Sequence, residues 1–177
     1  ISDTYPNTTA GILAATENLN RDFQETGLPL EVVPGAEYYL ERALLDKTKQ
    51  GDLLSFGDEK FVLFESPIHR EPMLLEEAIF TLTTHGYTPL LAHVERYRFL
   101  QDNPQRVDDL RRMGARFQVN HPSFHLPKTS RTGEMARWLY LKGMVDQLGT
   151  DIHRATSSDT ALAINGERRL YERLNER

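Results

Sequence analysis

Acidic and imidazole side chains follow one short apolar run after another in this sequence: Glu37, Glu65, His93, Asp151 and His153. The runs are typical of buried parallel strands, because they are continuous, short and rich in branched or aromatic residues. Since the carboxyl ends of parallel strands meet at one edge of a sheet, we expect these side chains to share one rim. Carboxylate and imidazole groups gathered in one place are ligands for Mn, Fe, Zn or Mg ions. A glutamate can also bridge two ions, as a multi-metal hydrolase requires.

Two further residues extend this predicted site toward a substrate. Arg96 lies three residues after His93, and its guanidinium group can bind an anion through two parallel hydrogen bonds. His69 lies in the loop after Glu65, close enough to the same rim to contact a bound substrate. The ligands and the nearby arginine together indicate a metal-dependent enzyme that acts on a phosphate ester.

Each of these residues also has an ordinary structural interpretation. A glutamate such as Glu37 is often a helix cap or a solvated loop residue, and Asp151 can cap a helix. Glu95 and Arg96 can form a surface ion pair that contributes little to stability. His93 can be hydrogen-bonded within the core. The joint pattern favours the metal site, because five such residues at successive strand ends are improbable as independent accidents.

The composition is that of a globular protein with a core of its own. The chain has 177 residues, of which 39% are hydrophobic and 27% charged, and its formal net charge is −5. That charge argues against binding to the phosphate backbone of nucleic acids. No apolar run approaches the roughly 18 residues of a membrane span. The absence of cysteine excludes a disulfide scaffold, a thiolate metal site and a cysteine nucleophile.

Strands alternate with helices of about a dozen residues, which predicts α/β architecture with a parallel sheet. We expect strands at 30–33, 61–64, 88–92, 116–119 and 145–149. We expect helices at 10–25, 40–49, 71–85, 104–113 and 132–142, and a last one capped by Ser157 or Ser158. Five strands are too few for a full barrel, which typically needs about 250 residues. The alternatives are a small open sheet and a barrel that lacks its first units.

At these residues the sequence resembles a known family. The relevant stretches are Gly-Ala-Glu-Tyr-Tyr at 35–39, Phe-Glu-Ser at 64–66, Leu-Ala-His-Val-Glu-Arg-Tyr at 91–97, Phe-Gln-Val-Asn at 117–120 and Gly-Thr-Asp-Ile-His at 149–153. In order and spacing they resemble the bacterial capsular-polysaccharide tyrosine phosphatases of the PHP (polymerase and histidinol phosphatase) superfamily. The similarity covers nearly the whole chain, and the Ala-His-x-Glu-Arg-Tyr block is its most specific part.

The resemblance implies a distorted (β/α)7 barrel, similar to a TIM barrel, with a trinuclear site, often manganese, at its carboxyl-end rim. It implies that Glu37 bridges two ions, that Glu65 and His93 hold one of them, and that Asp151 and His153 hold the others. Arg96 would contact the phosphate group. The implied activity is hydrolysis of a phosphotyrosine on the C-terminal tail of a tyrosine autokinase, in the cytoplasm, during capsular or exopolysaccharide synthesis. The sequence leaves open whether the protein forms homo-oligomers.

The sequence departs from the family at its beginning. Members of the family start with a His-x-His strand and a Thr-Pro-His strand end, and neither is present here. We therefore expect residues 1–177 to be a single PHP-type domain without its first strand–helix units. Two other functions stay open: a PHP phosphatase for a small ester such as histidinol phosphate, and a regulatory binding module without catalysis.

Overall fold

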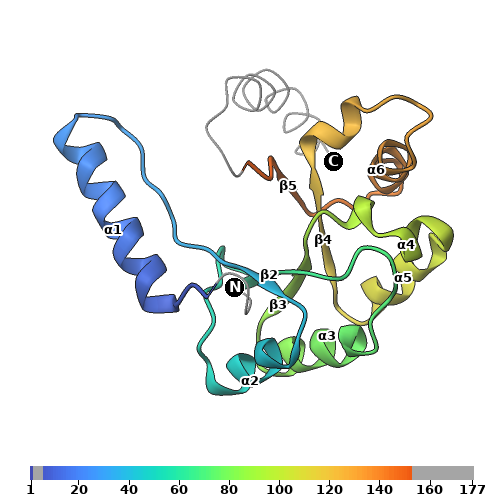
Figure 1. Ribbon diagram of the computed structural model, residues 1–177, viewed down its shortest axis with the longest axis horizontal. Helices are drawn as coiled ribbons and strands as arrows, with labels where there is room; N and C mark the ends of the chain where they lie inside the picture. The colour runs from blue at the N-terminus through green and yellow to red at the C-terminus, as the bar shows by residue number, and fades with distance from the viewer. Residues whose placement is uncertain (2–5, 153–177) are drawn as a thin grey trace.

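A computed structural model describes residue 1 and residues 6–152 of the chain. Five strands form a parallel sheet in which each strand pairs with the strand before it (Figure 1). The strands are β1 (Glu37–Tyr39), β2 (Phe61–Glu65), β3 (Thr88–Leu91), β4 (Arg116–Asn120) and β5 (Gln147–Gly149). The expected α/β class with a parallel sheet is confirmed.

Helices connect the strands, as parallel pairing requires. The α-helices are α1 (Thr9–Glu25), α2 (Arg42–Gln50), α3 (Leu74–Thr84), α4 (Arg98–Asp102), α5 (Gln105–Arg112) and α6 (Arg131–Leu141), and two 3₁₀ helices are η1 (Val94–Arg96) and η2 (His121–His125). Side-chain caps fix two of the starts. Thr8 accepts a hydrogen bond from the Gly11 N–H at 3.1 Å, and Ser130 accepts one from the Gly133 N–H at 3.3 Å.

The two faces of the sheet differ in chemistry because side chains alternate along each strand. In β4, Phe117 and Val119 are fully buried in the hydrophobic core. That core is shared with apolar side chains of α2, α3, α5 and α6. Gln118 and Asn120 project from the opposite face, where they line a cavity. Burial of each large apolar side chain contributes roughly 1.5–3 kcal/mol, so the helix-covered face stabilises the sheet while the other face can carry polar groups.

The strand expected at 30–33 is wrong. Residues 28–36 form no helix or strand, and Leu30 and Val33 are 60% and 68% exposed. Pro29 and Pro34 flank this stretch, and neither can donate a backbone hydrogen bond to a sheet. The first strand instead begins at Glu37, so this glutamate lies within a strand rather than after one.

The other expected elements are present with shifted ends. The predicted helix at 71–85 begins only at Leu74, and the short helix α4 was not predicted. The helix expected after Ser157 or Ser158 lies outside the described residues. Among the residues that are described, no helix is both long and apolar enough to cross a membrane.

Candidate metal centre

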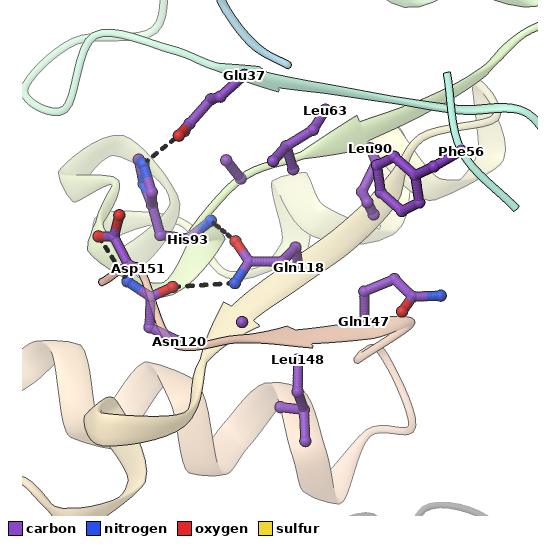
Figure 2. A pocket seen from close by; sticks show the side chains of 12 residues that line it. Glu37, Phe56, Leu63, Leu90, His93, Gln118, Asn120, Gln147, Leu148 and Asp151 are labelled. Atoms are coloured by element: carbon purple, nitrogen blue, oxygen red, sulfur yellow. Dashed lines mark hydrogen bonds and ion pairs between the residues drawn. The ribbon is translucent and has the colours of Figure 1, made fainter. Parts of the chain in front are cut away.

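Three predicted ligands converge on one another: Glu37 at the start of β1, Glu65 at the end of β2 and His93 shortly after β3. One ligand atom from each lies within 4.8 Å of the other two. His93 Nε2 is 3.1 Å from Glu37 Oε1 and 3.5 Å from Glu65 Oε2. Figure 2 shows the His93 ring pointing across the sheet toward the Glu37 carboxylate. Two carboxylates and one imidazole nitrogen aimed at a common point form a donor set that suits a divalent cation.

The backbone at His93 is held in an unusual conformation. Its φ of 34° and ψ of 48° lie in the left-handed region, which costs a non-glycine residue of order 1–3 kcal/mol. The pairing of β2 with β3 ends immediately before it, where the Ala92 N–H donates to the Phe64 carbonyl at 2.9 Å. The His93 N–H donates instead to Gln118 Oε1 at 2.5 Å. The turn therefore moves His93 out of the strand direction, and the β4 side chain holds it there.

Electrostatics at the three residues also fit a cation. Burial would lower the pKa of His93, but its hydrogen bonds to Glu37 and Glu65 outweigh this and raise the pKa to about 9. The hydrogen bond to His93 in turn lowers the pKa of Glu65. A positive charge is therefore stabilised between the two carboxylates, and a proton on His93 supplies it here. A divalent cation would meet the same carboxylates and would displace that proton.

Asp151 lies on the same rim but in a different environment. Its Oδ2 accepts hydrogen bonds from Arg96 Nη1 and from Asn120 Nδ2, both at 3.0 Å. Its backbone φ is 56°, the second left-handed residue at this rim after His93. The structure thus places Asp151 beside the cluster of Glu37, Glu65 and His93, but outside it. His153 lies outside the described residues.

A chain of amide side chains joins the two parts of the rim. Gln118 accepts from the His93 N–H and donates to Asn120 Oδ1 at 2.9 Å, and Asn120 donates to Asp151 (Figure 2). The sequence reasoning missed Gln118 and Asn120 as site residues. The alternation of Phe-Gln-Val-Asn in β4 could have found them, because it places both amides on the face away from the helices. Together these side chains line a cavity of about 200 Å³.

Gly149 makes room for this amide chain. A Cβ atom on Gly149 would lie 2.4 Å from Gln118 Nε2, which is closer than atoms can approach. Gly149 pairs with Asn120 across the sheet, so β5 brings its bare backbone against the amides of β4. A larger residue at this position would push the Gln118 amide away from its hydrogen bonds with His93 and Asn120.

Glu95 does not form the surface ion pair with Arg96 that was one interpretation of the sequence. It is fully buried, and its Oε1 accepts hydrogen bonds from Ser123 Oγ at 2.7 Å and the Asn120 N–H at 3.2 Å. Burial raises the pKa of the Glu95 carboxyl above its usual range. Glu95 thus ties η1, which follows His93, to the end of β4 and to η2.

His69 and Arg96 line a second cavity, next to the first. His69 is exposed and is not part of the cluster of Glu37, Glu65 and His93. Arg96 lines this second cavity, and its ion-pair partner Asp151 lines the first. The predicted substrate-binding residues therefore lie together beside the ligand cluster.

Comparisons with known proteins show which family and which relatives the chain resembles. The family model described as capsular polysaccharide synthesis, CpsB/CapC, matches residues 2–174. The tyrosine-protein phosphatase YwqE of Bacillus subtilis is 32% identical over 119 residues, which are 67% of this chain and 47% of that protein. The tyrosine-protein phosphatase CpsB of Streptococcus pneumoniae is 28% identical over 141 residues, 76% of this chain and 57% of that protein.

A solved chain is similar in fold along nearly the whole sequence. It comes from the crystal structures of YwqE and CpsB, described as metal-dependent tyrosine phosphatases, and matches with a TM-score of 0.80 at 24% identity. The match covers 99% of this chain and 74% of that chain. The present chain spans about half the length of the curated relatives it matches.

Proposed function

This chain belongs to the CpsB/CapC family of capsular polysaccharide synthesis proteins, and we propose that it carries the larger part of the catalytic site of a metal-dependent tyrosine-protein phosphatase. The observation that carries the proposal is the convergence of Glu37, Glu65 and His93 within 4.8 Å. The names of the relatives, which are tyrosine-protein phosphatases, support the same reaction. We further propose that the sheet is part of a distorted (β/α)7 barrel and that the protein works in the cytoplasm.

The proposed metal is manganese, with three ions in the complete protein. Glu37, Glu65 and His93 would hold and orient one ion, with Glu37 bridging to a second. Asp151 and His153 would hold the remaining ions. When bound, such ions supply an activated water molecule and offset the negative charge of a phosphate group. The Gln118 and Asn120 amides keep the ligands of the two parts at a fixed separation.

Arg96 is proposed to bind the phosphate group of the substrate. Its side chain is 40% exposed and its partner Asp151 is 20% exposed, so exchanging this ion pair for a phosphate contact costs little. A guanidinium group can then donate two hydrogen bonds to phosphoryl oxygens. The exchange would also leave the Asp151 carboxylate available to an ion. The proposed substrate is a phosphotyrosine in the tail of a tyrosine autokinase.

The first test measures hydrolysis of a phosphotyrosine peptide by the complete protein with Mn²⁺, in the presence and absence of a chelator. The second compares this rate with the rate on histidinol phosphate. We expect activity on the peptide that the chelator abolishes and added Mn²⁺ restores. Arg96→Ala should keep its metal while kcat/KM falls roughly 10–100-fold, whereas Arg112→Ala should leave both unchanged. Activity indifferent to the chelator, or loss of metal from Arg96→Ala, contradicts the proposed roles.

A further inference from the structure

A second cavity of about 410 Å³ adjoins the candidate metal centre on the side of η1. The residues that line it are Ile68, His69, Arg96, Arg98, Gln101, Arg131 and Thr132. It lies between the loop after β2, the start of α4 and the start of α6, and α4 and α6 lie side by side (Figure 1). Arg96 lines this cavity and also forms the ion pair with Asp151 beside the candidate metal centre.

The cavity is strongly basic although the chain as a whole is acidic. Three of its lining residues are arginines and one is a histidine, and none carries a carboxylate. The chain has a formal net charge of −5, so this concentration of positive charge is local. Within the described part of the chain, the Arg98 guanidinium group makes no hydrogen bond or ion pair, and Arg131 pairs with the exposed Asp102. At least one guanidinium group is therefore available to an anion from outside.

The walls of the cavity are fixed to the turn that carries Arg96. Gln101 Nε2 donates to the Glu95 carbonyl at 2.7 Å and reaches Thr132 Oγ1 at 3.4 Å. The Arg98 N–H donates to the Ile68 carbonyl at 2.8 Å. Thr132 also lies in the first turn of α6, where the helix dipole favours a negative charge. An anion in this cavity would thus stand at a defined place relative to Arg96.

We infer that this cavity binds an anionic side chain of the substrate, a carboxylate or a phosphate ester, within a few residues of the phosphotyrosine that is hydrolysed. The inference rests on the proposed function, because Arg96 must bind the scissile phosphate group. One extended peptide could reach both cavities, since Arg96 lines this one and its ion-pair partner Asp151 lines the other. Arginine is the cation best suited to both kinds of anion, because its planar fork matches either one with two hydrogen bonds. The cavity thereby determines which phosphotyrosines are preferred.

Peptides that differ only beside the phosphotyrosine test this inference in the complete, Mn²⁺-loaded protein. One set carries glutamates, one carries glutamines at the same positions, and one carries a second phosphotyrosine. We expect kcat/KM and binding affinity to be roughly tenfold higher for the anionic peptides than for the glutamine peptide at low salt. The advantage should shrink as salt rises, because the side chains are exposed. Comparing the two anionic sets shows which anion the cavity prefers.

The variant Arg98→Gln/Arg131→Gln removes two of the charges without touching the metal centre. We expect the anionic advantage to fall to about onefold, while kcat/KM for the glutamine peptide and for p-nitrophenyl phosphate stays unchanged. The matched control is Arg112→Gln, an exposed arginine at the end of α5, which should keep the full advantage.

Three outcomes would overturn the inference. Wild-type protein with no anionic advantage, or a double variant that keeps the advantage, leaves the phosphatase function standing but removes the role of this cavity. An equal loss on p-nitrophenyl phosphate shows that the arginines act on the metal centre instead. If wild-type protein hydrolyses no peptide, the proposed phosphatase function fails, and peptide affinities measured by fluorescence anisotropy still decide whether the cavity binds anions.

Discussion

The rim at the carboxyl end of the sheet buries polar side chains, whereas the helix α1 exposes apolar ones. At the rim polar groups are buried, with His93 at 4% exposure, Glu95 at 0% and Asn120 at 7%. In α1 no residue is buried, and Leu13 and Leu19 are each 40% exposed. Figure 1 shows α1 apart from the helices that cover the sheet.

The two regions differ in how many bonding partners their side chains have. At the rim the buried groups are joined by hydrogen bonds and ion pairs from several strands, so each depends on the others. The described contacts of α1 with the rest of the chain are few: Thr9 donates to Asp52 at 2.8 Å, Asn20 exchanges hydrogen bonds with the Val32 backbone, and Ile12 packs against the core. Substitutions at the rim should therefore lower the unfolding free energy strongly and non-additively. Substitutions of exposed residues in α1 should change it little.

The largest effect is expected at the ligand cluster. Glu65→Gln keeps the size of the side chain but removes a charged ligand, so Mn²⁺ affinity should fall by at least about 10–100-fold. The control Glu59→Gln changes an exposed glutamate in the turn before β2 and should leave the affinity unchanged. Isothermal titration calorimetry of both variants measures this. Equal affinities in the two variants would remove Glu65 from the metal centre.

A smaller effect is expected where β5 meets the amide chain. Gly149→Ala should displace Gln118 and cost about 1–3 kcal/mol of unfolding free energy, because the new methyl group overpacks the contact. Gly35→Ala is the matched control, since its Cβ would lie no closer than 4.0 Å to Phe56. Urea denaturation gives both values. An unchanged unfolding free energy in Gly149→Ala would mean that stability does not require Gln118 in its present position.

Stability without metal should depend on pH through His93. The folded-state pKa of His93, about 9, lies above its ordinary value of 6.5. Protonated His93 therefore contributes stability that is fully present below about pH 6.5 and is lost as the pH rises through about 9. The difference in melting temperature between these limits should be smaller in His93→Gln. An identical pH profile in the variant would show that His93 titrates normally.

The smallest effects are expected in α1. Leu13→Gln and Leu19→Gln should each change the unfolding free energy by no more than about 0.5 kcal/mol, as exposed substitutions usually do. Ile79→Ala in the buried core of α3 is the contrasting control and should cost about 2–5 kcal/mol. Thermal unfolding of the three variants provides the comparison. A cost of several kcal/mol in α1 would break the contrast and show that its apolar side chains are covered in solution.

Sequence patterns predicted the parts of this protein that depend on local chemistry. The apolar strands and amphipathic helices followed from side-chain periodicity, and His93 and Glu65 followed from their places at strand ends. The irregular segment at 28–36 was not predicted, because its apolar residues look like a strand, whereas its prolines lack backbone donors and the Val32 backbone is hydrogen-bonded to the Asn20 side chain instead. The burial of Glu95 and the amide chain were missed as well. Both depend on partners 25 residues away along the chain, which no local pattern contains.

The sequential order of the strands has a consequence for biosynthesis. Among the described strands, each from β2 to β5 pairs with the strand synthesised just before it, so none of them needs a later strand to insert between it and its earlier neighbour. Such a sheet can grow unit by unit as the chain leaves the ribosome, and unpaired strand edges stay exposed only briefly. The metal centre is the exception to this local order. The Glu37 carboxylate is hydrogen-bonded to His93, 56 residues later, so the cluster of Glu37, Glu65 and His93 cannot form until the chain has been made beyond β3.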